Sequence, residues 1–333
     1  MFSFDTIFPK KNKFTKNMKL IINIPAFNEE KVIAKTIQNL PKNIPGIDEI
    51  LIQVVDDGSS DETSFVAKEA GAHFVYSHPT NRGIGKTFRT AVDQALENGA
   101  DIFINIDADG QFNSNDIPHL LAPIFEKQAD MVVADRFGGK DAKNIPWIKD
   151  VLNRLAAKIV SLFLKTNIND LTCGFRALNK ETMLRLNLPG DFTYTQETII
   201  DALGKNLKIV WIPVTVTYFS DRKSRVVRTI GQFVSTSAGI IIKAVRDVRP
   251  LKFFGIPGAI LIFFSLILLS VFFSFYFQEF KITPYKNWLF ISFVLFMVGL
   301  QFIVFAFIAD MIKNSRRLTE DLLYRIKKDK YGE

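Results

Sequence analysis

Two long stretches near the end of the chain contain no charged residue, and they limit what this sequence can fold into. The first runs from Phe253 to Phe277 and the second from Trp288 to Ala309. Each is long enough to cross the roughly 30 Å hydrocarbon core of a bilayer, which takes about 20 apolar residues in a helix. We therefore predict two membrane spans, 253–277 and 288–312, joined as an antiparallel hairpin by a short connection. Two buried core helices are the alternative, and the absence of charge disfavours it.

Basic residues flank the outer ends of this hairpin. They are Lys243, Arg246, Arg249 and Lys252 before the first run and Lys313, Arg316 and Arg317 after the second. The connecting segment holds only Lys281 and Lys286, offset by Glu279. The positive-inside rule therefore places the part of the chain before the hairpin and both termini in the cytoplasm. Gln301 lies within the second run, where a polar side chain is expected to face a partner helix rather than lipid.

Composition narrows the class of protein further. The formal net charge of +8 allows nucleic acid, anionic lipid or phosphorylated substrates as partners. Because the basic residues concentrate beside the spans, the bilayer is the simpler partner, and no nucleic acid is expected. The single cysteine, Cys173, excludes an internal disulfide and fits a reducing compartment. The polar, Lys-rich segment 1–18 lacks the apolar core of a secretory signal.

The sequence before the spans alternates strand and helix patterns. The predicted strands are Leu20–Ala26, Glu49–Val55, His73–Ser77, Asp101–Ile106 and Asp130–Ala134, and the predicted helices are Glu29–Leu40, Glu62–Ala70, Lys86–Asn98 and Asp116–Lys127. This alternation is typical of a parallel sheet with helices on both faces. Ligands of such sheets bind beyond the carboxyl ends of the strands.

Asp107 and Asp109 follow directly after one of these strands. In an extended segment, residues two apart point to the same side, so both carboxylates can converge on one hard divalent cation. Gln111 offers a third oxygen, and Mg²⁺ or Mn²⁺ held in this way can also grip a diphosphate. The pattern therefore predicts a metal–nucleotide site at this strand end.

Two other strand ends carry polar clusters, Pro25–Glu30 and Asp56–Asp61. Taken singly, each cluster can be turn and helix-cap chemistry. Carboxylates gathered at one sheet edge repel one another unless a cation or ligand balances them, so together they favour a site. The segment Asn81–Lys86 is neither a P-loop nor a dinucleotide fingerprint, since the required glycines are missing. This segment is predicted to form either a turn near the metal–nucleotide site or the first turn of a helix without a role in binding.

Seven segments carry a family resemblance, namely Ile24–Glu30, Val54–Thr63, Asn81–Lys86, Asn105–Gln111, Ala134–Phe137, Asp170–Ala177 and Ser220–Arg225. They resemble the inverting family 2 glycosyltransferases with the GT-A fold. Cys173–Arg176 and the terminal hairpin narrow the resemblance to the polyprenol-phosphate glycosyltransferases, such as dolichyl-phosphate mannosyltransferase and undecaprenyl-phosphate glucosyltransferase. The resemblance implies an α/β, Rossmann-like GT-A domain with a mostly parallel sheet, interfacial helices and a C-terminal two-helix transmembrane hairpin.

The resemblance also implies roles for individual residues. The residues implied to bind the donor nucleotide are Pro25, Ala26, Phe27, Asn28, Glu30, Asp57, Lys86, Asp107 and Arg136. Those implied to bind the metal are Asp107, Asp109 and Gln111, and those implied to act in catalysis are Asp109, Asp170 and Arg176. Those implied to bind the acceptor or the diphosphate are Arg154, Arg222 and Arg225. Asp170 is either a base or a group that orients the sugar hydroxyls. The motif around Arg222 is shorter than the family pattern, so the role of Arg222 is left open.

These expectations divide the chain into a tail (1–18), a GT-A domain (19–225), an interfacial or juxtamembrane helix (226–252), the spans (253–312) and a basic cytoplasmic tail (313–333). The amphipathic stretch Ile148–Lys165 is a second candidate interfacial helix, with packing on the sheet as the alternative.

The predicted function is metal-dependent transfer of a single sugar from a nucleotide sugar to polyprenyl phosphate. GDP-mannose and UDP-glucose are the leading donors, UDP-N-acetylhexosamines stay open, and a homo-oligomer is left open. One alternative is transfer to another membrane lipid or a polysaccharide. Processive synthases of that kind usually carry a Gln-x-x-Arg-Trp segment, and this chain has none. The other alternative is an inactive nucleotide-binding scaffold, which the intact aspartates disfavour.

Overall fold

The computed structural model describes residues 17–138, 147–187, 194–217, 239, 242 and 245–332. By its internal contacts the chain forms two units. The first comprises Met1–Ile241 together with Leu323–Glu333, and the second comprises Ile242–Leu322. The first unit contains the α/β domain, and the second contains the long apolar helices.

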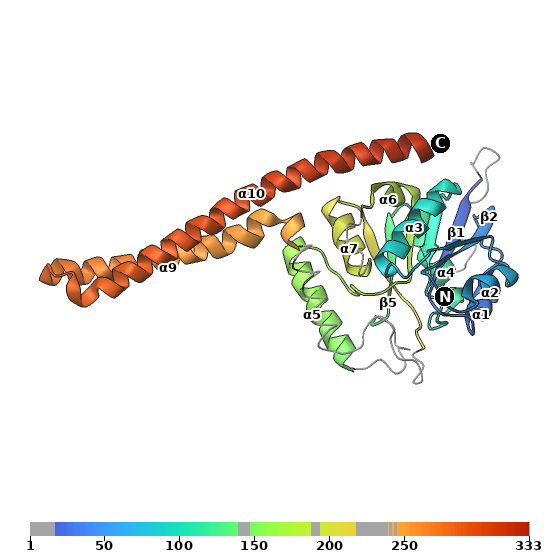
Figure 1. Ribbon diagram of the computed structural model, residues 1–333, viewed down its shortest axis with the longest axis horizontal. Coiled ribbons are helices and arrows are strands. Elements are labelled where there is room, and N and C mark those ends of the chain that lie inside the picture. Colours follow the sequence, from blue (N-terminus) through green and yellow to red (C-terminus); the bar gives the residue numbers. More distant parts are fainter. Residues whose placement is uncertain are drawn as a thin grey trace. The chain divides into compact units, whose positions relative to one another are not determined.

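A seven-stranded sheet with the order β3-β2-β1-β4-β6-β5-β7 forms the centre of the first unit (Figure 1). Its strands are β1 (Lys19–Ala26), β2 (Glu49–Asp56), β3 (Phe74–Ser77), β4 (Ile102–Asn105), β5 (Met131–Asp135), β6 (Arg176–Asn179) and β7 (Ile209–Pro213). All neighbouring strands are parallel except β6, which runs antiparallel to both β4 and β5. The predicted mostly parallel sheet is therefore confirmed, and β6 and β7 are additions that the apolar pattern did not reveal.

The helices of this unit are α1 (Ile33–Gln38), α2 (Thr63–Glu69), α3 (Ile84–Glu97), α4 (Ile117–Phe125), α5 (Trp147–Leu164), α6 (Lys180–Arg185) and α7 (Thr195–Gly204). In Figure 1, α3 lies beside α6, and it packs on β1 and β2, whereas α4 packs on β5, β6 and β7. The first helix begins four residues later than predicted. Before it, Asn28 adopts a left-handed φ of 53°, and the Glu29 amide donates to Thr63 Oγ1 at the start of α2 at 2.8 Å.

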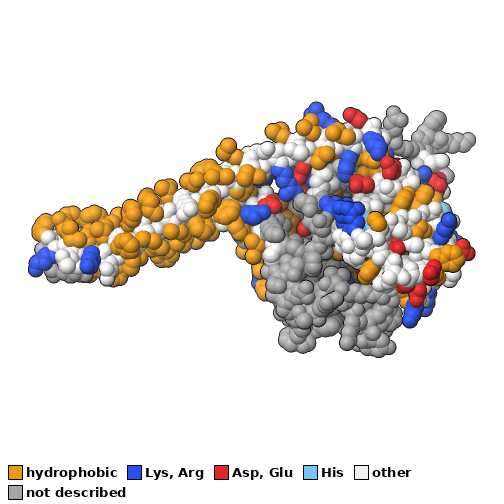
Figure 2. Space-filling view, in the orientation of Figure 1, with side chains coloured by type: hydrophobic (Ala, Val, Ile, Leu, Met, Phe, Trp, Pro, Cys, Tyr) orange, Lys and Arg blue, Asp and Glu red, His pale blue; other side chains and the backbone are white. Residues whose placement is uncertain are grey.

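The second unit contains α9 (Pro250–Glu279), a short 3₁₀ turn (Thr283–Tyr285) and most of α10 (Lys286–Tyr331). Both helices are long and apolar enough to cross a membrane, by length and composition. Figure 2 shows mainly hydrophobic side chains on the visible face of these helices. Gln301 is exposed and is not covered by α9, so the partner helix expected for it is not found within the hairpin.

Small residues bring α9 and α10 close together. A Cβ atom added at Gly299 would lie 2.7 Å from Ile262 Cγ1 and 2.9 Å from the Gly258 carbonyl oxygen. Farther along, Ser265 donates to the Ser292 carbonyl at 2.8 Å, and Ser292 donates to the Ser265 carbonyl at 3.1 Å. Close backbone approach and hydrogen bonds between helices are the usual sources of stability for helix pairs in lipid.

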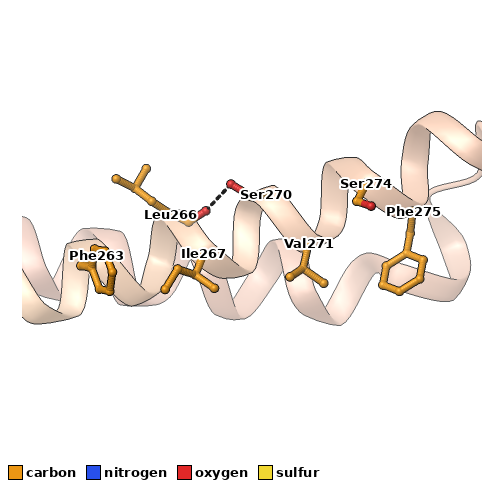
Figure 3. Close-up of a pocket in the computed structure, with 7 residues that line it drawn as sticks. All are labelled: Phe263, Leu266, Ile267, Ser270, Val271, Ser274 and Phe275. Atoms are coloured by element: carbon orange, nitrogen blue, oxygen red, sulfur yellow. Dashed lines mark hydrogen bonds between the residues drawn. The ribbon is translucent and has the colours of Figure 1, made fainter.

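The outward face of α9 carries a shallow groove. It is lined by Phe263, Leu266, Ile267, Ser270, Val271, Ser274 and Phe275 (Figure 3). The Ser270 hydroxyl donates to the Leu266 carbonyl one turn earlier at 2.8 Å. Its donor is therefore satisfied by its own helix, which is what a position facing lipid would require.

We predict that a bulkier residue at Gly299 separates the two helices. A chain carrying Ser265→Cys and Ser292→Cys should form a disulfide on mild oxidation in membranes, because the two hydroxyl oxygens are 3.4 Å apart. Adding Gly299→Val should cut the crosslinking yield several-fold. Gly255→Val is the matched control, since the nearest atom to an added Cβ there is 4.0 Å away. Equal yields in all three chains would contradict this packing.

Candidate active site

Three polar clusters meet at one edge of the sheet. β2, β1 and β4 are neighbours in the strand order, and Ala26 at the end of β1 pairs with Asp56 at the end of β2. Asp107 comes two residues after the end of β4, which lies on the other side of β1. The predicted convergence of Pro25–Glu30, Asp56–Asp61 and Asp107–Gln111 is therefore what the topology produces.

Hydrogen bonds join the first two clusters into one rigid rim. The Asn28 amide donates to Ser59 Oγ, and Asn28 Oδ1 accepts from the Ser60 amide, both at 2.8 Å. Glu30 accepts from the Glu62 amide at 3.2 Å. Pro25 and Ala26 lie at the buried end of β1, and Phe27 is half-buried beside them. The structure thus brings together the residues predicted to line the nucleoside pocket.

Asp57 is buried and already accepts several hydrogen bonds. Its Oδ1 accepts from the Arg82 amide and lies 2.9 Å from His78 Nδ1, and its Oδ2 accepts from the Gly83 amide at 2.9 Å. Gly83 precedes α3 with a φ of 87°, a conformation that favours glycine. Asp57 therefore shapes the turn that begins α3, and Lys86 lies in the first turn of that helix.

The Asp107 and Asp109 carboxyls form a pair that suits a cation. Both are half-buried, and burial, followed by the charge of Asp109, raises the pKa of Asp107 to about 7. Asp109 accepts from the Gln111 amide at 3.0 Å, which closes a turn and leaves the Gln111 side chain half-buried. A divalent ion would relieve the repulsion within the pair, so these residues fit a hard cation. The structure describes no cluster of three or more His, Cys, Asp and Glu side chains able to hold a metal, so Gln111 or the ligand would complete the coordination.

A packed layer lies against Asp107 and was not predicted from the sequence. A Cβ atom at Gly174 would lie 2.9 Å from Asp107 Oδ1 and 2.8 Å from the Tyr194 hydroxyl. That hydroxyl accepts from Asn105 Nδ2 at 2.8 Å, and the Tyr194 ring stacks on Phe88 with centroids 4.0 Å apart. Asn105 is part of a fully buried polar ladder, because it also accepts from Asn23 at 2.8 Å. The one available sequence signal was Asn105 itself, a polar residue inside an apolar strand.

Arg176 is placed in the interior. It has no exposed surface, and its guanidinium donates to the carbonyls of Cys173 and Thr195 and to the Thr198 hydroxyl. Its guanidinium carbon lies 5.0 Å from the centroid of the Tyr194 ring, and burial lowers its pKa. Arg176, for which the resemblance implies a catalytic role, thus lies buried beside Tyr194.

Asp170 is also fully buried, and it forms a bidentate ion pair with Arg136. Arg136 Nε donates to Asp170 Oδ2 at 2.7 Å and Arg136 Nη2 to Oδ1 at 3.0 Å. The Thr172 amide donates to Asp170 Oδ1 at 2.9 Å. Both Asp170 oxygens are occupied by Arg136 and Thr172, so the described geometry suits a group that positions Arg136 and leaves the two predicted roles, base or orienter of the sugar hydroxyls, untested.

The predicted acceptor residues are only partly described. Arg154 is exposed on α5, whose Leu155, Ile159 and Leu162 are 55%, 45% and 79% exposed. This apolar surface on an otherwise folded unit is what an interfacial helix presents. Arg222 and Arg225, and most of the proposed helix 226–252, lie outside the described residues.

Cys173 lies in the same buried layer, and burial raises the pKa of its thiol to about 12. Because the thiolate is the reactive form, we predict that iodoacetamide at pH 8 leaves the folded protein unmodified. Mass spectrometry should find full modification only after denaturation. Rapid alkylation of the native protein would contradict this placement of the loop before β6.

Comparisons with known proteins identify the family of this chain. Residues 21–185 match the model of the family described as glycosyl transferase family 2. UDP-N-acetylglucosamine--dolichyl-phosphate N-acetylglucosaminyltransferase of Methanococcus voltae is 31% identical over 215 residues, which cover 59% of this chain and 84% of that protein. Undecaprenyl-phosphate mannosyltransferase of Micrococcus luteus is 28% identical over 244 residues, covering 69% of this chain and 93% of that protein.

Among solved structures, glucosyl-3-phosphoglycerate synthase from Mycobacterium tuberculosis, in complex with Mn²⁺, UDP-glucose and phosphoglyceric acid, superposes with a TM-score of 0.54. The match has 20% identity and covers 69% of this chain and 79% of that one. It establishes the fold as GT-A. The family match and the named relatives define a glycosyltransferase. The chain belongs to glycosyl transferase family 2.

Proposed function

We propose that this enzyme transfers a single sugar from a nucleotide sugar to polyprenyl phosphate on the cytoplasmic face of a membrane. The observation that carries the proposal is the Asp107–Asp109 pair at the sheet edge, in one α/β unit with the buried Arg136–Asp170 ion pair. The first arrangement suits a cation and a diphosphate, and the second holds a guanidinium in place for an anion. The names of the relatives supply the acceptor class.

The donor would occupy the rim formed by the first two clusters. Its nucleoside would lie against residues at the ends of β1 and β2, namely Pro25, Ala26, Phe27, Asn28, Glu30 and Asp57, and against Lys86 in the first turn of α3. Asp107, Asp109 and Gln111 would hold Mg²⁺ or Mn²⁺ against the diphosphate. Such an ion stabilises the negative charge that develops on the leaving nucleoside diphosphate.

The acceptor phosphate is anionic near neutral pH and needs little help from a base. Asp170 would orient Arg136, and Arg136 would stabilise charge on the phosphates. Arg154, with Arg222 and Arg225, would bind the acceptor phosphate, since guanidinium forks match phosphate oxygens. In-line attack would invert the configuration of the anomeric carbon. Arg176 would act indirectly, as the support of Tyr194 beside Asp107.

Both ends of the hairpin belong on one side of the membrane in this proposal. The last residues of α10, from Leu323, belong by their contacts to the catalytic unit. There the Tyr324 hydroxyl donates to Glu181 at 3.0 Å, and Lys327 and Lys330 pair with Asp93 and Glu97. These contacts support a hairpin that leaves and re-enters the cytoplasm, in agreement with the flanking basic residues.

The test is transfer by the purified full-length protein to polyprenyl phosphate from a panel of radiolabelled donors. GDP-mannose, UDP-glucose and UDP-N-acetylglucosamine are the first to compare, because the relatives act with mannose and N-acetylglucosamine. We expect a chloroform-soluble, acid-labile product with one donor. Label found only in a polymer or in a non-phosphorylated lipid would favour the alternative acceptors, and no transfer from any donor would favour the scaffold.

A further inference from the structure

His78 is a histidine with no role in the proposed mechanism, and it contacts Asp57. It follows directly after β3, and its side chain is only 8% exposed. Its Nδ1 lies 2.9 Å from Asp57 Oδ1. Because an ionised carboxylate can only accept hydrogen bonds, Nδ1 carries the hydrogen and donates to Asp57. His78 therefore holds one oxygen of a residue that the proposed donor pocket uses.

The other ring nitrogen of His78 is held by α3. His78 Nε2 lies 3.0 Å from Thr90 Oγ1, and a hydroxyl can either donate or accept there. The His78 amide donates to the Asp56 carbonyl at 2.9 Å, which continues the parallel pairing of β3 with β2. Hydrogen bonds therefore fix both ring nitrogens and the backbone of His78.

These contacts leave one oxygen of Asp57 better placed than the other to accept from a ligand. A carboxylate has about four lone-pair positions, two on each oxygen. Asp57 Oδ1 accepts from His78 and from the Arg82 amide, whereas Oδ2 accepts from the Gly83 amide. Among the described residues, these donors fill both positions on Oδ1 and one of the two on Oδ2. A further donor, such as the ring N–H of a base, is therefore expected at Oδ2.

The loop after His78 packs closely on the loop after Asp57. A Cβ atom added at Gly58 would lie 2.5 Å from the Thr80 carbonyl carbon and 2.8 Å from the Asn81 nitrogen. Such backbone contact leaves little room for the two loops to move separately. The position of the Asp57 carboxylate therefore depends on the segment that begins at His78.

We infer that His78 is a positioning residue for the base of the donor nucleotide, because it turns Asp57 so that Oδ2 meets the ring N–H of uracil or guanine. This inference rests on the proposed function, and it deepens it. The Nδ1–H group of His78 keeps Oδ1 bound to the protein, and Thr90 keeps the imidazole ring from turning. Asp57 then needs no rearrangement when the nucleotide binds, and preorganisation of this kind raises affinity without adding a contact.

The test measures binding of UDP and GDP to the full-length protein in detergent with Mn²⁺, with inorganic pyrophosphate as the probe that lacks a base. His78→Gln places its amide nitrogen near the position of Nε2 and loses the donor to Asp57, so it should weaken binding of the preferred nucleotide about tenfold. His78→Asn places its amide nitrogen near the position of Nδ1, so it should bind that nucleotide within about threefold of wild type. Pyrophosphate affinity should be the same in all three proteins. His119→Gln, at an exposed histidine on α4, is the matched control and should change neither affinity.

A second variant keeps the test decisive if His78→Gln does not fold. Thr90→Val removes the hydroxyl that meets Nε2 and keeps the shape of the side chain. It should weaken nucleotide binding several-fold and leave pyrophosphate binding unchanged. Unchanged nucleotide affinity in Thr90→Val would count against a ring held in place by α3.

The outcomes separate this inference from the proposed function. Equal nucleotide affinity in wild type and His78→Gln, equal loss in His78→Asn and His78→Gln, or equal loss of nucleotide and pyrophosphate affinity would each overturn it. A wild type that binds neither UDP nor GDP more tightly than pyrophosphate would overturn it as well. Nucleotide binding that depends on His78, without any sugar transfer, would instead overturn the proposed function alone. In transfer assays the effect should fall on the KM for the donor and leave kcat and the KM for the lipid unchanged.

Discussion

Replacing Asp107 by asparagine is expected to abolish sugar transfer and at the same time to make the metal-free protein more heat-stable at pH 8. Loss of one charged ligand should cost about a thousandfold in rate, because a bound ion supplies several kcal/mol of charge stabilisation. The stability gain follows from the pKa of about 7, against an ordinary value of 3.8. The melting temperature should rise by roughly 2–4 °C for each kcal/mol by which removal of the buried Asp107 charge increases the free energy of unfolding.

The stability of the metal-free protein should fall as the pH rises, because the pKa of Asp107 is raised on folding. A carboxyl whose pKa is higher in the folded chain binds its proton more tightly there, so it favours folding below pH 4. That contribution is lost as the pH rises through about 7. Without metal, wild type should therefore lose more stability between pH 5 and 8 than Asp107→Asn does. Identical pH profiles of the two proteins, measured by calorimetry with a chelator present, would refute the burial of this charge.

Replacing Gly174 by alanine should inactivate the enzyme although it adds only one methyl group. The new Cβ would lie 2.8 Å from the Tyr194 hydroxyl and 2.9 and 3.0 Å from the two Asp107 oxygens, so something must shift. Tyr194 is stacked on Phe88 and bonded to Asn105, which leaves Asp107 as the group most easily displaced. A displacement of about 1 Å in a reacting geometry can cost roughly a hundredfold in kcat.

Gly71→Ala is the control for general damage. Gly71 has a φ of 101°, so alanine there strains the backbone, and no atom lies within 4 Å of the added Cβ. We expect Gly71→Ala to lower the melting temperature with little effect on kcat. We expect Gly174→Ala to lower kcat with a smaller effect on the melting temperature. If Gly174→Ala kept wild-type kcat and metal affinity, the close packing of this glycine against Asp107 would be wrong.

The pattern of apolar and charged residues within short stretches of sequence was enough to predict the strands at the sheet edge and the two-helix hairpin. Each of the five predicted strands is present, because alternating or continuous apolar runs report burial directly. Asp107 and Asp109 could be placed at a strand end for the same reason. The two uncharged runs predicted helices that have the length and composition of membrane spans. Both signals are contained in short windows of sequence.

What the sequence did not reveal depends on contacts between distant segments. β6 inserts antiparallel between β4 and β5, and its four residues, beginning at Arg176, show no strand pattern. The burial of Arg176 and its partners from residues 173–198 likewise become visible only in the folded chain. Tyr194 and Asn105 are 89 positions apart, so no window could connect them. Asp57 accepts from the amides of Arg82 and Gly83, which are 25 and 26 positions away, so no short window shows these bonds either.

The most direct test of the account is Mn²⁺ binding, followed by electron paramagnetic resonance, in the presence of the nucleoside diphosphate of the active donor. Wild type should bind a single ion per chain, more tightly with the nucleotide than without it. Asp109→Ala should lose that ion while keeping a wild-type circular dichroism spectrum. Undiminished Mn²⁺ binding by Asp109→Ala would contradict the claim that the aspartate pair carries the metal and, through it, the leaving diphosphate.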